Sequence, residues 1–251
     1  MRNLFIALVL IAGSLLVFSC KKDNTNPSKS NVQLIVKSGQ TTPVKSPSFM
    51  KASSSLISTL TMDSFLVNLG NIEFGIDEHA EGLSEDVVDS LVEAQELKGP
   101  YLIDLLSQNT LNGLSIGTTL VPNAIYKSLK FQFIRSHDSS KPDIFDRSVY
   151  ITGTLNGKPL KFWTTEEFEY EVEFPDSSNF TLTGNNFKIY LDMNINQIVS
   201  SINQFDFSSV KDGNNNGIYE IGPNDIDGNT QLSHYIADAL KNEIKLDRED
   251  N

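Results

Sequence analysis

Short segments in which apolar and polar residues alternate recur along this chain, and a period of two is typical of strands with one buried face. Val32, Leu34 and Val36 begin the series, and EEFEYEVEF at 166–174 is its most regular member. Further segments of this kind lie at 65–76, 101–109, 125–135, 148–163 and 178–195. Many short strands separated by turn residues predict a mainly β fold, an antiparallel β-sandwich or barrel.

Two glycines refine this pattern. Asn156-Gly157 lies between two β-rich runs and predicts a type I′ hairpin over 148–163. Gly70 lies where the apolar positions shift phase, from Phe65, Val67 and Leu69 to Ile72 and Phe74. A glycine at such a shift predicts a bulge or sharp bend.

Helical spacing replaces alternation near the C-terminus, and it predicts one or two short helices packed on the sandwich. The first, within 194–205, and the second, within 232–246, place these apolar residues on one face: Ile195, Ile198, Val199 and Ile202, then Leu232, Ile236, Ala239, Leu240 and Ile244. Asn229 or Thr230 is the predicted cap of the second helix.

The first twenty residues are typical of a lipoprotein signal. Arg2 precedes an apolar run from Leu4 to Val17, and Ser19 precedes Cys20, the only cysteine. We therefore expect a signal peptide at 1–19 and a flexible tether at 20–30 that is attached to the membrane through a lipid on Cys20. The alternative is an ordinary signal peptide with cleavage elsewhere, since Phe18 replaces a small residue.

Charge narrows the range of partners. The formal net charge is −12, and it becomes −13 when residues 1–19, with their single cation Arg2, are removed. An acidic surface repels phosphate backbones, so no nucleic-acid partner is expected. Cations are the favoured small partners. With no second cysteine, the fold must be stabilised by burial and by any bound metal.

One segment, DGNNNGIYEIGPNDIDGN at 212–229, resembles a calcium loop. In the EF-hand pattern, oxygen-bearing side chains occupy positions 1, 3 and 5, glycine occupies position 6, and the carbonyl of position 7 points inward. Asp212, Asn214, Asn216, Gly217 and Ile218 fill these places in order. Such alternating hard oxygens predict a structural Ca²⁺ site, because Ca²⁺ takes six to eight oxygen ligands.

The loop departs from the pattern at position 12, where Pro223 replaces a bidentate glutamate. Glu220 at position 9, together with Asp225 or Asp227 folding back, would supply the missing charge. The alternative is an Asn-rich turn whose side chains hydrogen-bond only their own backbone.

Signals for catalysis are weak, and no enzymatic activity is expected. His79, His137 and His234 are the only histidines, and none has metal-site spacing with another ligand. No GxSxG motif is present, and the glutamate pairs at 166–171 are typical of a solvated strand face. The single tryptophan, Trp163, is expected to pack across strands, with a sugar-stacking platform as the alternative.

The order of features from residue 31 to about 205 resembles an uncharacterised family of Gram-negative bacterial lipoproteins. The matching pieces are FLVNLGNIEFGI, YLIDLLSQ, LSIGTTLVPNA, IYKSLKFQF and NFKIYLDMNI. Where such relatives carry Pro-Ala-Gly-x-Tyr, this chain has Pro122-Asn-Ala-Ile-Tyr126. The resemblance implies a prealbumin-like or immunoglobulin-like sandwich and no known activity.

Together these features predict a β-sandwich at 31–205 and a calcium-loop segment with a helix at 206–251. We expect an outer-membrane lipoprotein on the periplasmic or cell-surface side that serves as a non-catalytic binding or structural module with a protein or glycan partner. The alternatives are a subunit of a surface adhesion or nutrient-uptake assembly, and a hydrolase of glycans or peptides.

Overall fold

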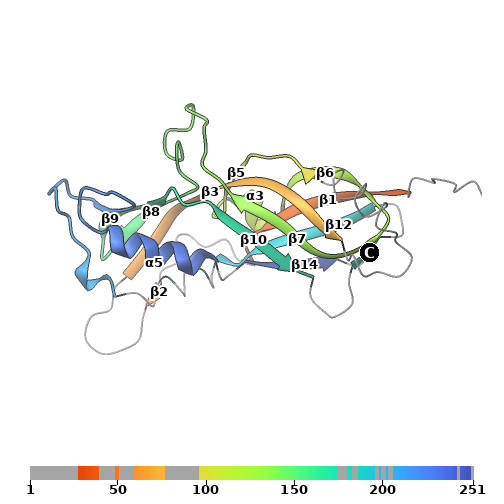
Figure 1. The fold of residues 1–251 in the computed structure, drawn as a ribbon. Helices are drawn as coiled ribbons and strands as arrows, with labels where there is room; N and C mark the ends of the chain where they lie inside the picture. Colours follow the sequence, from red (N-terminus) through yellow and green to blue (C-terminus); the bar gives the residue numbers. More distant parts are fainter. Residues whose placement is uncertain are drawn as a thin grey trace, which may run out of the picture.

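The computed structural model describes residues 28–39, 49–50, 59–76, 96–174, 180–182, 186–195, 198, 202, 206–241 and 244–249. Over these residues the chain is mainly β, as the alternating pattern predicts, and its strands form two sheets (Figure 1). The predicted signal segment with Cys20, the acidic segment at 77–95 that contains His79, and Val199 lie outside the described residues.

The smaller sheet has the strand order β14 (Ile244–Glu249), β12 (Asn186–Met193), β1 (Lys29–Lys37) and β6 (Leu114–Pro122). β1 and β12 are parallel, with Asn31 opposite Asn186 and Lys37 opposite Asp192. The expectation of a purely antiparallel fold is therefore wrong. Alternation marks a strand but not the direction of its neighbour, and no short turn constrains two strands this far apart in the chain.

The larger sheet has the order β10-β7-β3-β8-β9-β13, with four short strands beside it. Its members are β2 (Phe49–Met50), β3 (Thr59–Ile76), β4 (Glu96–Leu97), β5 (Tyr101–Asp104), β7 (Ile125–Phe133), β8 (Val149–Leu155), β9 (Lys158–Thr164), β10 (Phe168–Glu173), β11 (Phe180–Thr181) and β13 (Tyr219–Ile221). The last pair, β9 and β13, is also parallel.

The long strand β3 runs through both halves of the molecule. Leu66 pairs with β5 on one edge and with β8 on the other, and Leu69 pairs with β5 and with β7. β7 and β8 therefore lie end to end along one edge of β3. The pairing with β7 shifts register between Leu69 and Ile72, which confirms the irregularity predicted at Gly70.

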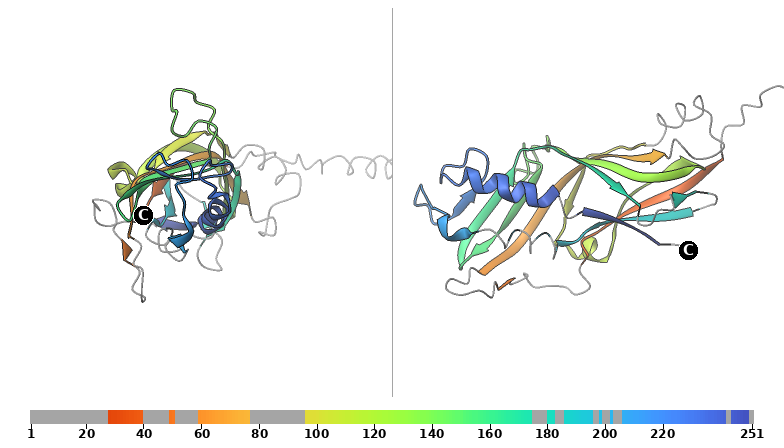
Figure 2. Two further views of the ribbon diagram at one scale, coloured as in Figure 1. Left: turned by 90° about the vertical axis from the view of Figure 1, so that its left-hand side faces the viewer. Right: turned by 60° about the horizontal axis from the view of Figure 1, so that its bottom comes forward.

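Different elements pack against the two halves of the larger sheet (Figures 1 and 2). In one, the smaller sheet lies over β7, β10 and the end of β3. In the other, α5 (Thr230–Lys241) covers β8, β9 and β13, and Ile236 of α5 lines a small apolar cavity together with Met62 and Phe162. Both contribute to one buried apolar cluster, so the protein has a continuous core.

Tyr170 connects the aromatic part of this core to α5. Its ring centroid lies 4.9 Å from that of Phe131 and 5.1 Å from that of Phe133. Its hydroxyl donates to the Leu240 carbonyl at 3.4 Å. Burial raises the pKa of the Tyr170 phenol, and burial likewise raises the pKa of Tyr126.

The predicted Asn-Gly hairpin is confirmed, and the predicted C-terminal helices are confirmed in part. Asn156 and Gly157 have φ values of 55° and 79°, as a type I′ turn requires, and they join β8 to β9. Ile195, Ile198 and Ile202 are helical and buried. Ile244 does not extend the second helix, because it begins β14 and pairs with Met193. Two short helical elements complete the fold, α3 (Gln108–Asn112) and the 3₁₀ helix η1 (Phe207–Ser209).

Candidate functional site: the loop before helix α5

The loop at 210–229 lies between η1 and α5, at the end of the molecule away from β1 and β6 (Figure 1). Its middle forms β13, which pairs in parallel with β9: Tyr219 is opposite Leu160, and Ile221 is opposite Phe162. Ile221 is fully buried. The two polar halves of the loop are thus held on either side of a strand that is fixed to the larger sheet.

Asp212 organises the first half. Its Oδ1 accepts from the Asn216 N–H at 3.0 Å, and its Oδ2 accepts from the Gly217 N–H at 3.1 Å. The chain can turn this tightly because Asn215 and Gly217 have positive φ values of 58° and 85°. The Lys158 ammonium, whose Nζ lies 2.5 Å from Oδ2, is the main cause that lowers the Asp212 pKa, and the backbone N–H groups add to it.

Asp227 connects the second half to the first. It is only 3% exposed, and its two carboxylate oxygens accept from the Asn214 N–H at 3.2 Å and the Glu220 N–H at 2.8 Å. The backbones are also close, since a Cβ on Gly213 would lie 2.8 Å from the Asp227 carbonyl oxygen. Asp227, sixteenth in the motif that starts at Asp212, therefore lies beside the third and ninth residues.

Asn214, Asn216 and Glu220 complete the cluster. Glu220 Oε2 accepts from the Asn214 amide at 3.0 Å and from the Asn216 amide at 3.4 Å. The amide oxygens accept from backbone within the loop: Asn214 Oδ1 from Asn216 N–H and Asn216 Oδ1 from Ile218 N–H, both at 2.8 Å. An amide oxygen has two lone pairs, so one such bond leaves capacity for a second partner.

The carboxylate of Asp225, another predicted ligand, has different hydrogen-bond partners. Its carboxylate accepts from the N–H groups of Gly222 at 3.3 Å and Asn229 at 2.8 Å, and from the Thr230 hydroxyl at 3.3 Å. These bonds hold the carboxylate at the start of α5. Among the described residues, no group of three or more His, Cys, Asp or Glu side chains has a metal-binding arrangement.

Asn229 ties the loop to its surroundings. Its Nδ2 donates to the carbonyls of Lys211 and Glu220, each at 2.8 Å, and its Oδ1 accepts from the Lys211 N–H at 3.0 Å. The residue is 6% exposed, and its carbonyl accepts from the N–H groups of Leu232 and Ser233 in the first turn of α5. It stands at the predicted cap position, but its side chain binds the loop.

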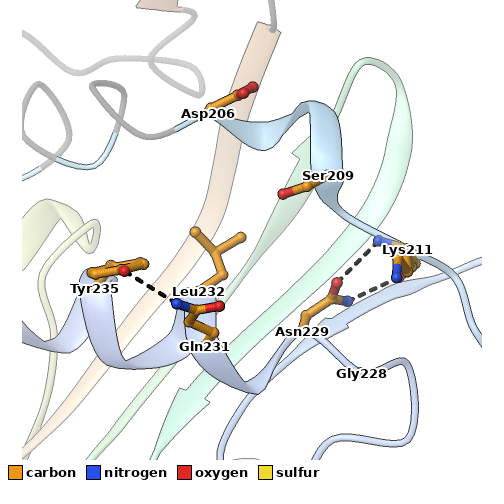
Figure 3. A pocket seen from close by; sticks show the side chains of 8 residues that line it. All are labelled: Asp206, Ser209, Lys211, Gly228, Asn229, Gln231, Leu232 and Tyr235. Carbon is orange, nitrogen blue, oxygen red and sulfur yellow. Dashed lines mark hydrogen bonds between the residues drawn. The ribbon is translucent and has the colours of Figure 1, made fainter.

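A pocket of about 420 Å³ adjoins this loop, between η1 and the first turns of α5 (Figure 3). It is lined by Asp206, Ser209, Lys211, Gly228, Asn229, Gln231, Leu232 and Tyr235. The Asn229 amide is directed to Lys211, and Gln231 donates to the Tyr235 hydroxyl at 3.2 Å, as Figure 3 shows. The best-buried polar side chain of the pocket is therefore engaged with protein backbone.

The other candidate residues lie apart from this loop or pack against it. His234 Nδ1 lies 2.9 Å from Glu166 Oε1 on the surface, and His137 is exposed between β7 and β8. Trp163 packs against the loop, because a Cβ on Gly222 would lie 2.2 Å from its Cε2. The Arg147 guanidinium carbon is 5.2 Å from the indole centroid. These contacts agree with the cross-strand packing expected of Trp163.

Sequence reasoning missed two residues of the site, Lys158 and the side chain of Asn229. The sequence places Lys158 directly after the Asn-Gly turn, but nothing in it shows that β13 pairs with β9 and brings Asp212 alongside. The cap signal at Asn229 gives its position in the chain but not the direction of its amide.

No helix in the described part of the chain combines the length and the apolarity that crossing a membrane requires. Comparisons of the chain with protein-family models, with curated proteins and with solved structures find no match. What the protein does must therefore be argued from its own residues.

Proposed function

We propose that this protein is an outer-membrane lipoprotein, anchored through Cys20, whose folded part is a non-catalytic binding or structural module stabilised by Ca²⁺. The observation that carries the proposal is the hydrogen-bond network that links Asp212, Glu220 and Asp227 to two asparagines of the same loop. The apolar run before Cys20 and the acidic composition support an anchored module that attracts cations.

Calcium is the cation that suits these groups best. The loop presents hard oxygens from carboxylates and amides, and no described histidine is hydrogen-bonded to them. Asp212, Glu220 and Asp227 bring three negative charges to one loop, and Lys158 pairs only with Asp212. A divalent ion bound to these oxygens would balance the remaining negative charge and fix the start of α5 through Asp227, Glu220 and Asn229.

The scaffold of the proposal is a sandwich of prealbumin-like or immunoglobulin-like type. Support comes from the packing of the smaller sheet over β7 and β10 with a shared apolar core. The parallel pairs β1–β12 and β9–β13 are features that any such assignment must accommodate.

The calcium proposal is tested by melting the full-length protein in detergent with excess Ca²⁺ and again with a chelator. A ligand that binds only the folded state at one hundred times its Kd adds about 2.7 kcal/mol, so we expect a rise of several degrees. Asp212→Ala should abolish the shift. Asp138→Ala, which removes an exposed carboxylate from the turn after β7, should retain it. Equal melting temperatures with Ca²⁺ and chelator would refute the proposal.

The anchor is tested separately by growing cells with an alkyne-labelled fatty acid. The wild-type protein should carry the label and fractionate with membranes, and Cys20→Ser should do neither. A free thiol at Cys20 in the mature protein would support the alternative of an ordinary signal peptide.

A further inference from the structure

Lys158 lies beside the loop and contacts both Asp212 and Tyr219. It is the first residue of β9, directly after the Asn156-Gly157 turn. Its Nζ lies 2.5 Å from Asp212 Oδ2 and 4.3 Å from the centroid of the Tyr219 ring. The Lys158 side chain is 31% exposed and that of Asp212 is 13% exposed. The ammonium is therefore held by a charge-assisted hydrogen bond and an aromatic face together.

The carboxylate that Lys158 contacts belongs to Asp212, which holds position 1 of the calcium-loop pattern and would be the first ligand of the proposed ion. An ammonium on Oδ2 and a divalent cation in the loop would be two positive charges within a few ångströms that share one carboxylate. They repel strongly, so the two states exclude each other. The β8–β9 hairpin fixes the backbone of Lys158, and Tyr219 on β13 contacts its ammonium. Both ends of the Lys158 side chain are therefore held in place.

We propose that Lys158 is a built-in competitor of the divalent cation: its ammonium neutralises Asp212 in the metal-free protein and must leave when the ion binds. The inference rests on the calcium loop proposed above and adds to it how the affinity is set. A site whose competent state is populated only part of the time has an apparent Kd raised by that fraction. Lys158 thus shifts the loop toward the weak affinities of extracellular calcium modules, with Kd of about 10⁻⁴–10⁻³ M.

The test is isothermal titration of full-length protein in detergent with CaCl₂, comparing wild type with Lys158→Met, Lys158→Arg and Lys130→Met. Methionine keeps the length of the stem and removes the charge, so the Kd for Ca²⁺ should fall about tenfold. Arginine keeps the charge, so the Kd should stay near that of the wild type. Lys130, 3.8 Å from Glu171, lies on β7, which is distant from β9 in the sheet, and its loss should leave the Kd unchanged.

The outcomes separate this inference from the calcium proposal. If wild type and Lys158→Met bind Ca²⁺ equally, the competitor role is refuted and the calcium loop stands. If only Lys158→Met binds, Lys158 has replaced the ion in the native protein, so the competitor role stands and the calcium proposal fails. If neither binds, both fail. Circular dichroism and melting of each variant in chelator establish that all four proteins are folded before titration.

Discussion

Gly222 lies against the indole of Trp163 so closely that a β-carbon at position 222 would fall 2.2 Å from Cε2 and 2.5 Å from Cζ2. The contact joins the loop, just after β13, to the end of strand β9. Because Trp163 is the only tryptophan, the indole emission reports on this contact with no contribution from another tryptophan.

We expect Gly222→Ala to destabilise the protein by about 2 kcal/mol or more, because overpacking forces the indole or the loop backbone to move. Urea unfolding followed by circular dichroism measures this in all the variants, since Trp163→Phe removes the only tryptophan. The double variant with Trp163→Phe should lose less stability than the sum of the single variants, since a smaller ring leaves room for the methyl group. Strict additivity would show that Gly222 is needed for its backbone rather than for its contact with Trp163.

Asp227→Asn should weaken the loop by about 1–3 kcal/mol, because an amide NH₂ group would replace one of the two oxygens that accept backbone N–H groups in a buried place. Denaturant unfolding in chelator measures the loss without any contribution from bound metal. Glu169→Gln, an exposed change on β10, should stay within about 0.5 kcal/mol of the wild type. A loss no larger than that of the control would mean that the loop is held without Asp227.

Asn229→Ala removes three side-chain hydrogen bonds to the backbones of Lys211 and Glu220, and we expect it to cost about 2 kcal/mol. Asn229→Asp should be at least as harmful, because it replaces the donating amide with a carboxylate that faces two carbonyl oxygens. Hydrogen exchange should show faster opening of β13 and the first turn of α5 in both variants. Gln231→Ala, also in that turn, removes only an exposed bond to Tyr235 and serves as the control.

Stability should decline above about pH 10, the ordinary pKa of a tyrosine phenol. Burial raises the pKa of Tyr126 and Tyr170 in the folded protein, so the unfolded chain releases these protons first. The stability from each phenol is complete below its unfolded pKa and falls by about 1.4 kcal/mol per pH unit above it. Urea unfolding between pH 9 and pH 11.5 measures this slope. Tyr170→Phe should reduce it, and an unchanged slope would exclude Tyr170 as a contributor.

The elements that the sequence predicts correctly are those decided by neighbouring residues. Asn156-Gly157 adopts positive φ at both positions because those residue types tolerate it, and the alternation around Tyr170 places its aromatic face in the core. The irregularity at Gly70 follows from the same kind of local signal, a change of phase in the apolar positions.

What the sequence could not predict depends on contacts between distant segments. The parallel partners of β1 and β9 have no turn signal, because the intervening chain is long. Ile244 fits the apolar face of a helix, yet it pairs with Met193 because β12 offers an open edge. The contact between Lys158 and Asp212 exists only because β13 lies beside β9, so charge patterning along the chain could not reveal it.

The 18 residues of β3 extend along the long axis of the molecule and would span roughly 60 Å at the usual rise of a strand. β1, the first strand after the segment that contains Cys20, lies toward one end of this axis, and the loop before α5 lies at the other (Figure 1). In a protein anchored through Cys20, as proposed above, the loop would be presented at the end of this axis farther from β1.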